Sequence, residues 1–335
     1  MTAPHTALRV LMITNSWPTP GRPRTTYFIK RQAEFLQAAG VDVDVFHFQG
    51  AKRPWNYLVA WLRLRRRMAH HRYDLAHAQF GQSGLLVLPK RLPLVVTFRG
   101  DDLEGIVDSD GRITLPGRVL KLISQGVARC ADAAIVVSEH MKQFLHPSVR
   151  TYVVPSGLDF QLFRPIPRNE ARCHVGLPTD KRLVLFVGNP ELPRKRYVLA
   201  REAVAVLNRS LPAELVLAWG TPHADIPFLM SACDALVFTS LQEGSPNVVK
   251  EALACNLPVV SVRVGDVPVR LKDVEGCELC ADDRPETIAA ALERVLRRNQ
   301  RIAGRSVVQH LDEQKLTEQV IAIYRSVARA RESSN

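Results

Sequence analysis

Short apolar stretches recur along the chain and alternate with segments of helical periodicity. Each stretch has the length of a strand buried on both faces, and about 10–15 residues of helical pattern separate many of them. This alternation predicts parallel sheets, because parallel neighbours need a crossover helix between them. The expected strands lie at residues 10–13, 41–45, 94–98, 134–137, 183–187, 214–218, 235–238 and 258–261.

One parallel sheet would be unusually large for a chain of 335 residues, so the length favours two domains that each bury a core. The Pro- and polar-rich stretch 155–167 is the expected joint. The final part of the chain, residues 314–331, has apolar residues at helical spacing and predicts a helix. The fold class is therefore α/β, with two Rossmann-like doubly wound domains.

The charge of the chain predicts an anionic partner. Lysine and arginine exceed aspartate and glutamate by 45 to 33, which gives a net charge of +12. Phosphates, a lipid surface or a nucleic acid would suit such a chain. Nucleic acid is the weakest of the three, because the sequence has no aromatic RNA-binding motif, zinc finger or helix-turn-helix signal.

Cysteines and hydropathy point to a cytoplasmic protein. The six cysteines are too sparse for a disulfide framework, which fits a reducing compartment. One C-x-x-C pair, Cys277 and Cys280, lacks the second ligand pair that a zinc site needs. Apolar runs are far shorter than a membrane span, and residues 8–13 read as a first strand rather than a secretory signal.

Two carboxylates, Glu243 and Glu251, lie eight positions apart around a Gly-Ser-Pro turn. An apolar run precedes the turn and a helix is expected to follow it, so the first turn of that helix offers free backbone N–H groups to a phosphate. Glu251, about two turns into the helix, has the reach to accept from vicinal hydroxyls, and Glu243 stands at the mouth of the turn. This arrangement suggests a sugar-nucleotide site. The alternative is that both glutamates only complement a helix dipole.

This segment resembles the retaining glycosyltransferases of family 4, whose hallmark is the E-x7-E pattern. The flanking residues 232–237, 258–260 and 265–267 are similar to that family as well. The resemblance implies the GT-B architecture, in which two Rossmann-like domains face a cleft. Residues 1–160 would form the acceptor-side domain, residues 161–312 the donor-side domain, and residues 313–335 a terminal helix that crosses back to the first domain.

The resemblance also implies roles for the residues around the turn. Glu251 would accept from the ribose hydroxyls, Glu243 would contact the donor sugar, and backbone N–H groups near Asn247 and Val248 would hold the diphosphate. Ser245 would belong to the sugar- and acceptor-contacting loops. Retention would proceed by attack on the face of the departing diphosphate, whose oxygen takes the acceptor proton, without a protein nucleophile.

A basic loop follows the strand at 183–187. It opens at Gly188 and carries Arg194 and Lys195. In related enzymes a basic pair here holds the donor diphosphate, and fixed cations would stabilise the charge of the leaving group. Lys195 matches the lysine of the family, whereas Arg194 lies closer to it than the usual spacing. The alternative is a solvated basic loop.

The chain departs from the family in its first half. Arg99 stands where members commonly have a histidine that contacts the transferring sugar. A permanent cation cannot act as an acid or base, but it can hold a diphosphate or an anionic sugar. The alternative is an arginine paired with Asp101 or Asp102. The loop after the first strand offers Gly21 alone in place of the usual glycine pair.

No metal or redox cofactor is expected. Asp101, which we place with the sugar- and acceptor-contacting loops, forms an Asp-Asp pair with Asp102. Transferases of the GT-B type do not need the aspartate–metal motif of the other transferase fold. No G-x-G-x-x-G follows any expected strand, which argues against a nicotinamide cofactor.

A basic segment with tryptophan, Trp55–Arg72, suggests peripheral contact with an anionic membrane. Trp55, Leu58, Val59 and Leu62 form one helical stripe, and arginines crowd the neighbouring faces. The alternative is a packing helix with a solvated basic face.

The sequence therefore predicts a metal-independent, retaining glycosyltransferase that uses a nucleoside-diphosphate sugar, with uridine as the favoured base. The acceptor would be a glycan or a lipid-linked glycan of the cell envelope or of an exopolysaccharide. Two rivals remain, a sugar-nucleotide epimerase of the same architecture and a non-catalytic binder of nucleotide sugars or polyanions.

Overall fold

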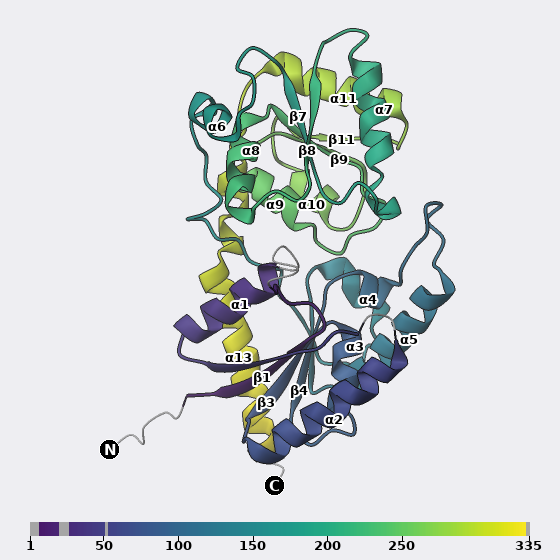
Figure 1. Cartoon of the computed structure of the whole chain (residues 1–335), viewed down its shortest axis with the longest axis vertical. Helices are drawn as coiled ribbons and strands as arrows, with labels where there is room; N and C mark the ends of the chain where they lie inside the picture. Colours follow the sequence, from purple (N-terminus) through teal and green to yellow (C-terminus); the bar gives the residue numbers. More distant parts are fainter. Residues whose placement is uncertain (1–6, 20–26, 51–52, 333–335) are drawn as a thin grey trace. The chain divides into compact units, whose positions relative to one another are not determined.

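The computed structural model describes residues 7–19, 27–50 and 53–332. They form two compact units (Figure 1). The first unit takes the chain up to Ile106, then residues Ile113–Gly157, and finally the C-terminal segment from Glu313; the second takes Val107–Arg112 and Leu158–Asp312. Each unit contains one sheet whose strands are all parallel, so the α/β class with two doubly wound units is confirmed.

The sheet of the first unit has the strand order β2-β1-β3-β4-β5-β6. Its strands are β1 (Arg9–Thr14), β2 (Asp42–His47), β3 (Leu75–Gln79), β4 (Leu94–Phe98), β5 (Ala133–Val136) and β6 (Thr151–Val153). Its helices are α1 (Tyr27–Ala38), α2 (Pro54–His70), α3 (Gly81–Gly84), η1 (Leu85–Val87), α4 (Asp101–Glu104), α5 (Leu115–Cys130), η2 (Glu139–Phe144) and α13 (Glu313–Glu332).

Helices cover both faces of this sheet, and alternate strand residues face each layer. One face packs with α2, η1 and α5 into a single apolar cluster that includes Leu11, Val96, Leu64 and Val127. On the other face, α13 packs against β3, β4 and α1 (Figure 1). The sheet is therefore buried on both sides, which is why its strands read as continuous apolar runs.

Strand β3 is the exception, because buried polar residues interrupt its apolar run. His77 Nδ1 lies 2.6 Å from the hydroxyl of Tyr324 on α13, and His77 Nε2 lies 2.7 Å from Thr97 Oγ1 on β4. Burial lowers the pKa of His77 to about 3, so the ring is neutral at ordinary pH. The same burial raises the pKa of Tyr324. These bonds tie the terminal helix to the sheet.

A buried ion pair also fixes the start of α13. Arg31 Nε lies 2.8 Å from Glu313 Oε2, and both side chains are almost entirely buried. Arg31 Nη2 donates to the carbonyl of Gly157. The terminal helix expected at residues 314–331 is thus present, one residue longer at each end, and it belongs to the first unit.

The sheet of the second unit has the order β11-β10-β9-β7-β8. Its strands are β7 (Leu183–Val187), β8 (Glu214–Ala218), β9 (Ala235–Phe238), β10 (Val259–Ser261) and β11 (Glu278–Leu279). Its helices are α6 (Arg168–Val175), η3 (Pro193–Lys195), α7 (Tyr197–Leu207), η4 (His223–Asp225), α8 (Ile226–Ala232), α9 (Asn247–Ala254), α10 (Val267–Leu271), α11 (Pro285–Arg298), α12 (Gly304–Val308) and η5 (Gln309–Leu311).

Each of the eight expected strands is present within one or two residues of its expected ends. Within the described ranges, no helix combines the length and the apolar character that crossing a membrane requires.

Candidate functional site

The turn between β9 and α9 carries the two glutamates of the E-x7-E pattern. Strand β9 ends at Phe238, and α9 begins at Asn247 after Pro246 in an extended conformation. No side chain of the described residues caps this helix start, so its first N–H groups remain available to a ligand. Glu243 lies in the turn, and Glu251 is a buried residue of α9. The predicted strand, turn and helix are all present.

The backbone of the turn rests directly against Gly265. The φ of Gly265 is +53°, and a Cβ atom there would lie 2.4 Å from the carbonyl oxygen of Glu243. Ser245 Oγ donates to Asp266 Oδ2 at 2.8 Å, and Arg270 Nε donates to the same oxygen at 2.9 Å. Ser245 therefore anchors the turn to the start of α10.

The structure brings Lys195 and Arg194 to Glu243. Lys195 Nζ lies 2.6 Å from Glu243 Oε1, and Arg194 Nη1 lies 3.4 Å from the same oxygen. All three side chains are at least half-buried. Two cations therefore share one carboxylate, which leaves the cluster with a net positive charge. We call these three residues the basic cluster.

Hydrogen bonds to the end of β9 hold the loop of the basic cluster in place. Thr239 Oγ1 donates to the carbonyl of Lys195 at 3.0 Å, and the N–H of Leu241 donates to the carbonyl of Arg194 at 2.7 Å. The loop begins at Gly188, whose φ of +149° is a conformation that glycine adopts at little cost. This loop is part of a fixed structure, not a solvated tail.

Asn247, the first residue of α9, has a buried side-chain oxygen that accepts no hydrogen bond from the described residues. An unsatisfied buried acceptor costs about 1–3 kcal/mol, so such groups are rare unless a ligand or water completes them. A hydroxyl of a bound sugar or ribose would supply the missing donor. Val248 follows within the first turn of the helix.

Arg99 lies in the first unit, directly after β4, and its guanidinium donates to neutral groups. Nη2 donates to Gln79 Oε1 at 2.7 Å and to Gln32 Oε1 at 3.2 Å, and Nη1 donates to Ser156 Oγ at 2.7 Å. The guanidinium carbon lies 4.7 Å from the centre of the Phe28 ring. Burial lowers the pKa of Arg99 to about 10, which still leaves the side chain charged.

The structure does not pair the guanidinium of Arg99 with Asp102. Asp102 Oδ1 instead accepts from the backbone N–H groups of Arg99 and Gly100, and Oδ2 accepts from that of Gly81. Asp102 thus shapes the loop, and burial raises its pKa. Asp101 opens the short helix α4 beside it.

Gly21, which we expected in a loop that contacts the sugar or the acceptor, lies outside the described residues. Among the described histidines, cysteines and acidic residues, no group of three or more is placed to hold a metal ion. In the C-x-x-C pair, Cys277 Sγ accepts from the N–H of Val259 at 3.3 Å, and Cys280 is buried.

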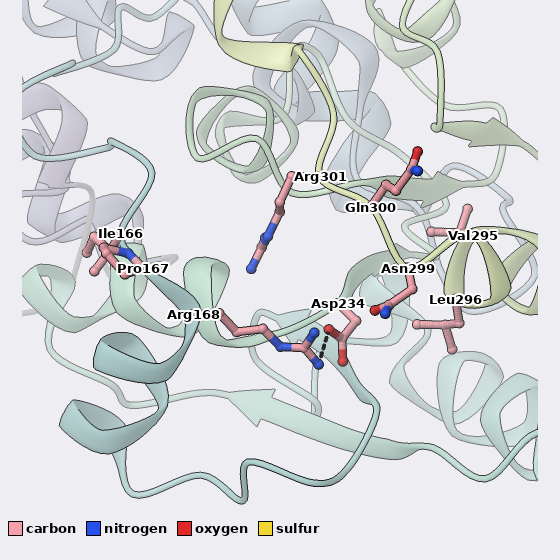
Figure 2. A pocket seen from close by; sticks show the side chains of 9 residues that line it. All are labelled: Ile166, Pro167, Arg168, Asp234, Val295, Leu296, Asn299, Gln300 and Arg301. Carbon is pink, nitrogen blue, oxygen red and sulfur yellow. Dashed lines mark ion pairs between the residues drawn. The ribbon is translucent and has the colours of Figure 1, made fainter.

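A pocket of about 290 Å³ in the second unit lies at the opposite edge of the sheet. It is lined by residues that include Arg168, Asp234 and Arg301 (Figure 2). Asp234 directly precedes β9, so this pocket is at the amino ends of the strands, whereas the turn with Glu243 follows the carboxyl end of β9. Ligands of doubly wound sheets bind beyond the carboxyl ends.

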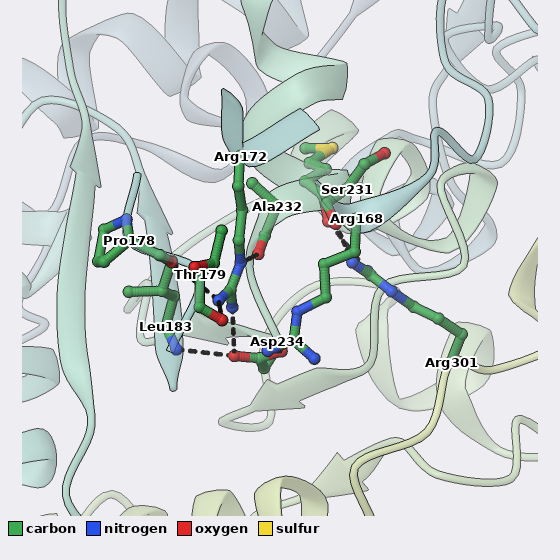
Figure 3. Close-up of polar contacts among 10 residues, drawn as sticks. Arg168, Arg172, Pro178, Thr179, Leu183, Ser231, Ala232, Asp234 and Arg301 are labelled. Atoms are coloured by element: carbon green, nitrogen blue, oxygen red, sulfur yellow. Dashed lines mark hydrogen bonds and ion pairs between the residues drawn. The ribbon is translucent and has the colours of Figure 1, made fainter. Parts of the chain in front are cut away.

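Arg301, which lines this pocket, and Arg172, which pairs with its lining residue Asp234, both donate to backbone carbonyls. Arg172, which is fully buried, donates to the carbonyls of Ala232, Pro178 and Thr179, and it pairs with Asp234 (Figure 3). Arg301 donates to the carbonyls of Met230 and Ser231 at the end of α8. The bonds to Met230, Ser231 and Ala232 satisfy carbonyls at the C-terminus of α8, which is a structural role.

Helix α2 contains most of the segment Trp55–Arg72. Ala60 and Leu64 face the core, and Trp55, Leu58 and Leu62 are exposed. Two of its arginines are held by the protein. Arg65 donates to the carbonyls of Val87 and Pro89, and Arg67 pairs with Asp44.

The polar shell around Arg99 leaves little trace in the sequence. Gln79 lies on β3, Ser156 lies in the loop after β6, and Gln32 lies on α1. Neither β3 nor β6 was among the expected strands. The only signal was the pair of polar residues at alternate positions of β3, His77 and Gln79, since polar residues within a buried strand need partners.

Comparisons with known proteins agree with this geometry. A family model described as Glycosyltransferase Family 4 matches residues 9–162, and one described as Glycosyl transferases group 1 matches residues 183–298. The chain is 27% identical over 304 residues to the D-inositol 3-phosphate glycosyltransferase of Mycobacterium tuberculosis, with 76% of this chain covered. It spans about 62% of the length of that relative.

Solved structures share the fold. A sucrose-phosphate synthase from Thermosynechococcus elongatus has a TM-score of 0.81 at 19% identity, over 97% of this chain and 100% of the other. HepE from Anabaena, solved in complex with UDP, has a TM-score of 0.69 at 17% identity, over 96% of this chain and 100% of the other. Each unit thus has the Rossmann-like fold that the domains of GT-B glycosyltransferases share.

Proposed function

Because the chain belongs to glycosyltransferase family 4, we propose that it transfers a sugar from a nucleoside-diphosphate sugar to a glycan or lipid-linked acceptor. The observation that carries this proposal is the basic cluster beside the uncapped start of α9. Two fixed cations and several free N–H groups form a site for a diphosphate. The buried, unsatisfied oxygen of Asn247 supports a ligand with hydroxyl groups next to it.

The donor would lie along the β9–α9 turn. Backbone N–H groups of Asn247 and Val248 and the side chains of Lys195 and Arg194 would hold the diphosphate, and Gly188 would let the loop come close to it. Glu251 would accept from the ribose hydroxyls. A phosphate oxygen of the donor would replace Glu243 as a partner of Lys195, and Glu243 would then contact the donor sugar. UDP is the favoured nucleotide, which the UDP complex of HepE supports.

The reaction would retain the configuration of the sugar. The acceptor oxygen forms a bond to the anomeric carbon on the face from which the diphosphate departs, and the bond between that carbon and the phosphate oxygen breaks. The departing phosphate oxygen takes the acceptor proton, so no protein base is needed. Lys195 and Arg194 would stabilise the negative charge of the leaving diphosphate. This role needs no metal, so we propose metal-independent catalysis.

Arg99 would supply a second cation for the substrate. Its partners among the described residues are neutral amides, a hydroxyl and an aromatic ring, so its charge is not cancelled by an ion pair there. An anionic group of the donor or the acceptor would suit it. Asp101 and Gly21 would contribute to the surrounding sugar- and acceptor-contacting loops.

The setting would be the cytoplasmic side of a membrane, in the synthesis of an envelope glycan or exopolysaccharide. Cytoplasmic nucleotide sugars and a lipid-linked acceptor would meet there. The exposed Trp55, Leu58 and Leu62 of α2 support peripheral contact with an anionic bilayer.

Product analysis tests the proposal. The purified protein is incubated with a panel of UDP- and GDP-sugars, with and without an acceptor glycan and with and without EDTA. We expect a glycoside of retained configuration that forms only with acceptor and is unaffected by EDTA. Lys195→Gln should abolish it, whereas the matched exposed variant Lys272→Gln should not. An isomerised nucleotide sugar formed without acceptor would indicate an epimerase. Nucleotide binding without any turnover would favour a binding protein.

A further inference from the structure

Helix α5 presents a stripe of exposed apolar side chains. Leu115, Val119 and Leu122 recur at spacings of four and three residues, so they share one side of the helix. They are 50–75% exposed, whereas Val127 and Ala128 on the opposite side are buried. Isolated exposed apolar residues are common, but three in line on one helix face mark a contact surface.

Helix α2 presents a matching stripe. Trp55, Leu58 and Leu62 are 44–70% exposed and lie opposite the core-facing Ala60 and Leu64. Both helices pack on the same apolar cluster on one face of the first sheet (Figure 1). The outer sides of α2 and α5 are therefore exposed on the same side of the first unit.

The charges on the two helices have a single sign. Helix α2 carries four arginines, α5 carries two arginines and a lysine, and neither contains an acidic residue. Arg63, Arg66, Arg118 and Arg129 make no side-chain hydrogen bond or ion pair with any described residue, and all four are exposed. Exposed apolar residues flanked by unpaired cations are the composition of an interfacial amphipathic helix.

We propose that α2 and α5 together form a surface that docks on an anionic lipid bilayer. The six apolar side chains would enter the boundary between head groups and acyl chains, and the four arginines would contact lipid phosphates. An anionic bilayer fits better than a protein partner because the surface lacks any acidic residue that would fix an orientation. The inference deepens the proposed function, on which it rests, by placing the lipid-linked acceptor at the face of the first unit.

Vesicle co-sedimentation tests the surface. The full chain is mixed with vesicles of phosphatidylcholine alone or with added phosphatidylglycerol. We expect binding only to the anionic vesicles. The variants Leu115→Ser/Leu122→Ser on α5 and Arg63→Gln/Arg66→Gln on α2 should each weaken binding about tenfold. The matched control Arg201→Gln/Val269→Ser alters an exposed arginine and an 80% exposed valine of the second unit and should bind as the parent does.

Three outcomes would contradict the proposal. Unchanged vesicle binding of the α5 double variant would mean that α5 is not part of the docking surface. Equal binding to neutral and anionic vesicles would mean that the arginines do not contribute to docking. Loss of a concentration-dependent dimer in the α5 variant, without loss of vesicle binding, would assign the stripe to a second copy of the chain. UDP titration of the same variants separates this test from the proposed function, because none of these residues contacts the basic cluster.

Discussion

Glu243 and Lys195 form an ion pair, with Oε1 and Nζ 2.6 Å apart. A bound diphosphate would compete with Glu243 for the ammonium group of Lys195 and for Arg194. We therefore propose two opposed effects of the carboxylate on the donor. It would orient the sugar, and it would partly neutralise the cations that bind the phosphates.

Replacing Glu243 by Gln should separate these effects. The variant removes the competing charge, so we expect UDP to bind as tightly as to the parent or several-fold more tightly, while transfer falls at least about a hundredfold. Calorimetric titration and turnover measure the two effects. Glu286→Gln, a glutamate in the first turn of α11, is the matched control. Full turnover of Glu243→Gln would reduce Glu243 to a helix-start charge.

The buried His77 should make the stability of the fold depend on pH. Its pKa in the folded state, about 3, is below that of an unfolded histidine, so the unfolded state binds more protons between these values. Its contribution to stability is complete above about pH 6.5 and is lost as the pH falls toward about 3, at up to about 1.4 kcal/mol per pH unit.

The variant His77→Gln should therefore have a shallower decline of unfolding free energy between about pH 6 and pH 4 than the parent. Urea unfolding at several pH values measures it, and His146→Gln, at an exposed site, should leave the slope unchanged. The raised pKa of Asp102 acts with the opposite sign, but it is common to both proteins and cancels in the comparison. Identical slopes for parent and His77→Gln would contradict the account.

At the level of elements, Asp234 joins α6 to the start of β7. It pairs with Arg168 and with the fully buried Arg172, and it accepts from the N–H of Leu183 at 2.8 Å. Removing its charge would leave a buried guanidinium without a counterion.

We expect Asp234→Asn to destabilise the second unit by about 3 kcal/mol. The exposed pair of Glu275 with Arg298 offers the control, since Glu275→Gln should change stability little. Denaturant unfolding measures both. An Asp234→Asn variant as stable as the parent would mean that the carbonyl contacts of Arg172 suffice.

How far the sequence predicts each element depends on its chemistry. Strands such as β4 and β7 were predictable because they are apolar throughout, and α13 because its apolar residues have helical spacing. Strand β3 was not, because His77 and Gln79 satisfy partners that are distant in sequence. The strands β6 and β11, of three and two residues, are too short for any periodicity.

The candidate site, too, was predictable only in part. The turn with Glu243 and the loop with Lys195 could be located from local patterns, but their ion pair joins residues 48 positions apart and appears only in the fold. The arginines of α2 could be counted from the sequence. Arg65 and Arg67 are held by neighbours from η1 and β2, whereas Arg63 and Arg66 pair with no residue that the structure describes, and the sequence does not distinguish the two pairs.

At the level of the whole molecule, two groups of basic residues belong to different units. The basic cluster lies in the second unit, beside α9, and the arginines of α2 and α5 that pair with no described residue lie in the first. The proposed nucleotide site would use the first group, and the proposed bilayer contact would use the second. The net charge of +12 is therefore informative only once it is divided between the units.

The most direct test of the central claim is calorimetric titration of the parent, Glu251→Ala and the exposed control Glu202→Ala with UDP and with GDP. We expect UDP to bind the parent and the control, and Glu251→Ala to lose about 1.5–3 kcal/mol or more of the binding free energy, because each hydrogen bond to the ribose is charge-assisted. Equal UDP affinity of all three proteins would contradict the ribose assignment. Failure of the parent to bind either nucleotide would contradict the donor site itself.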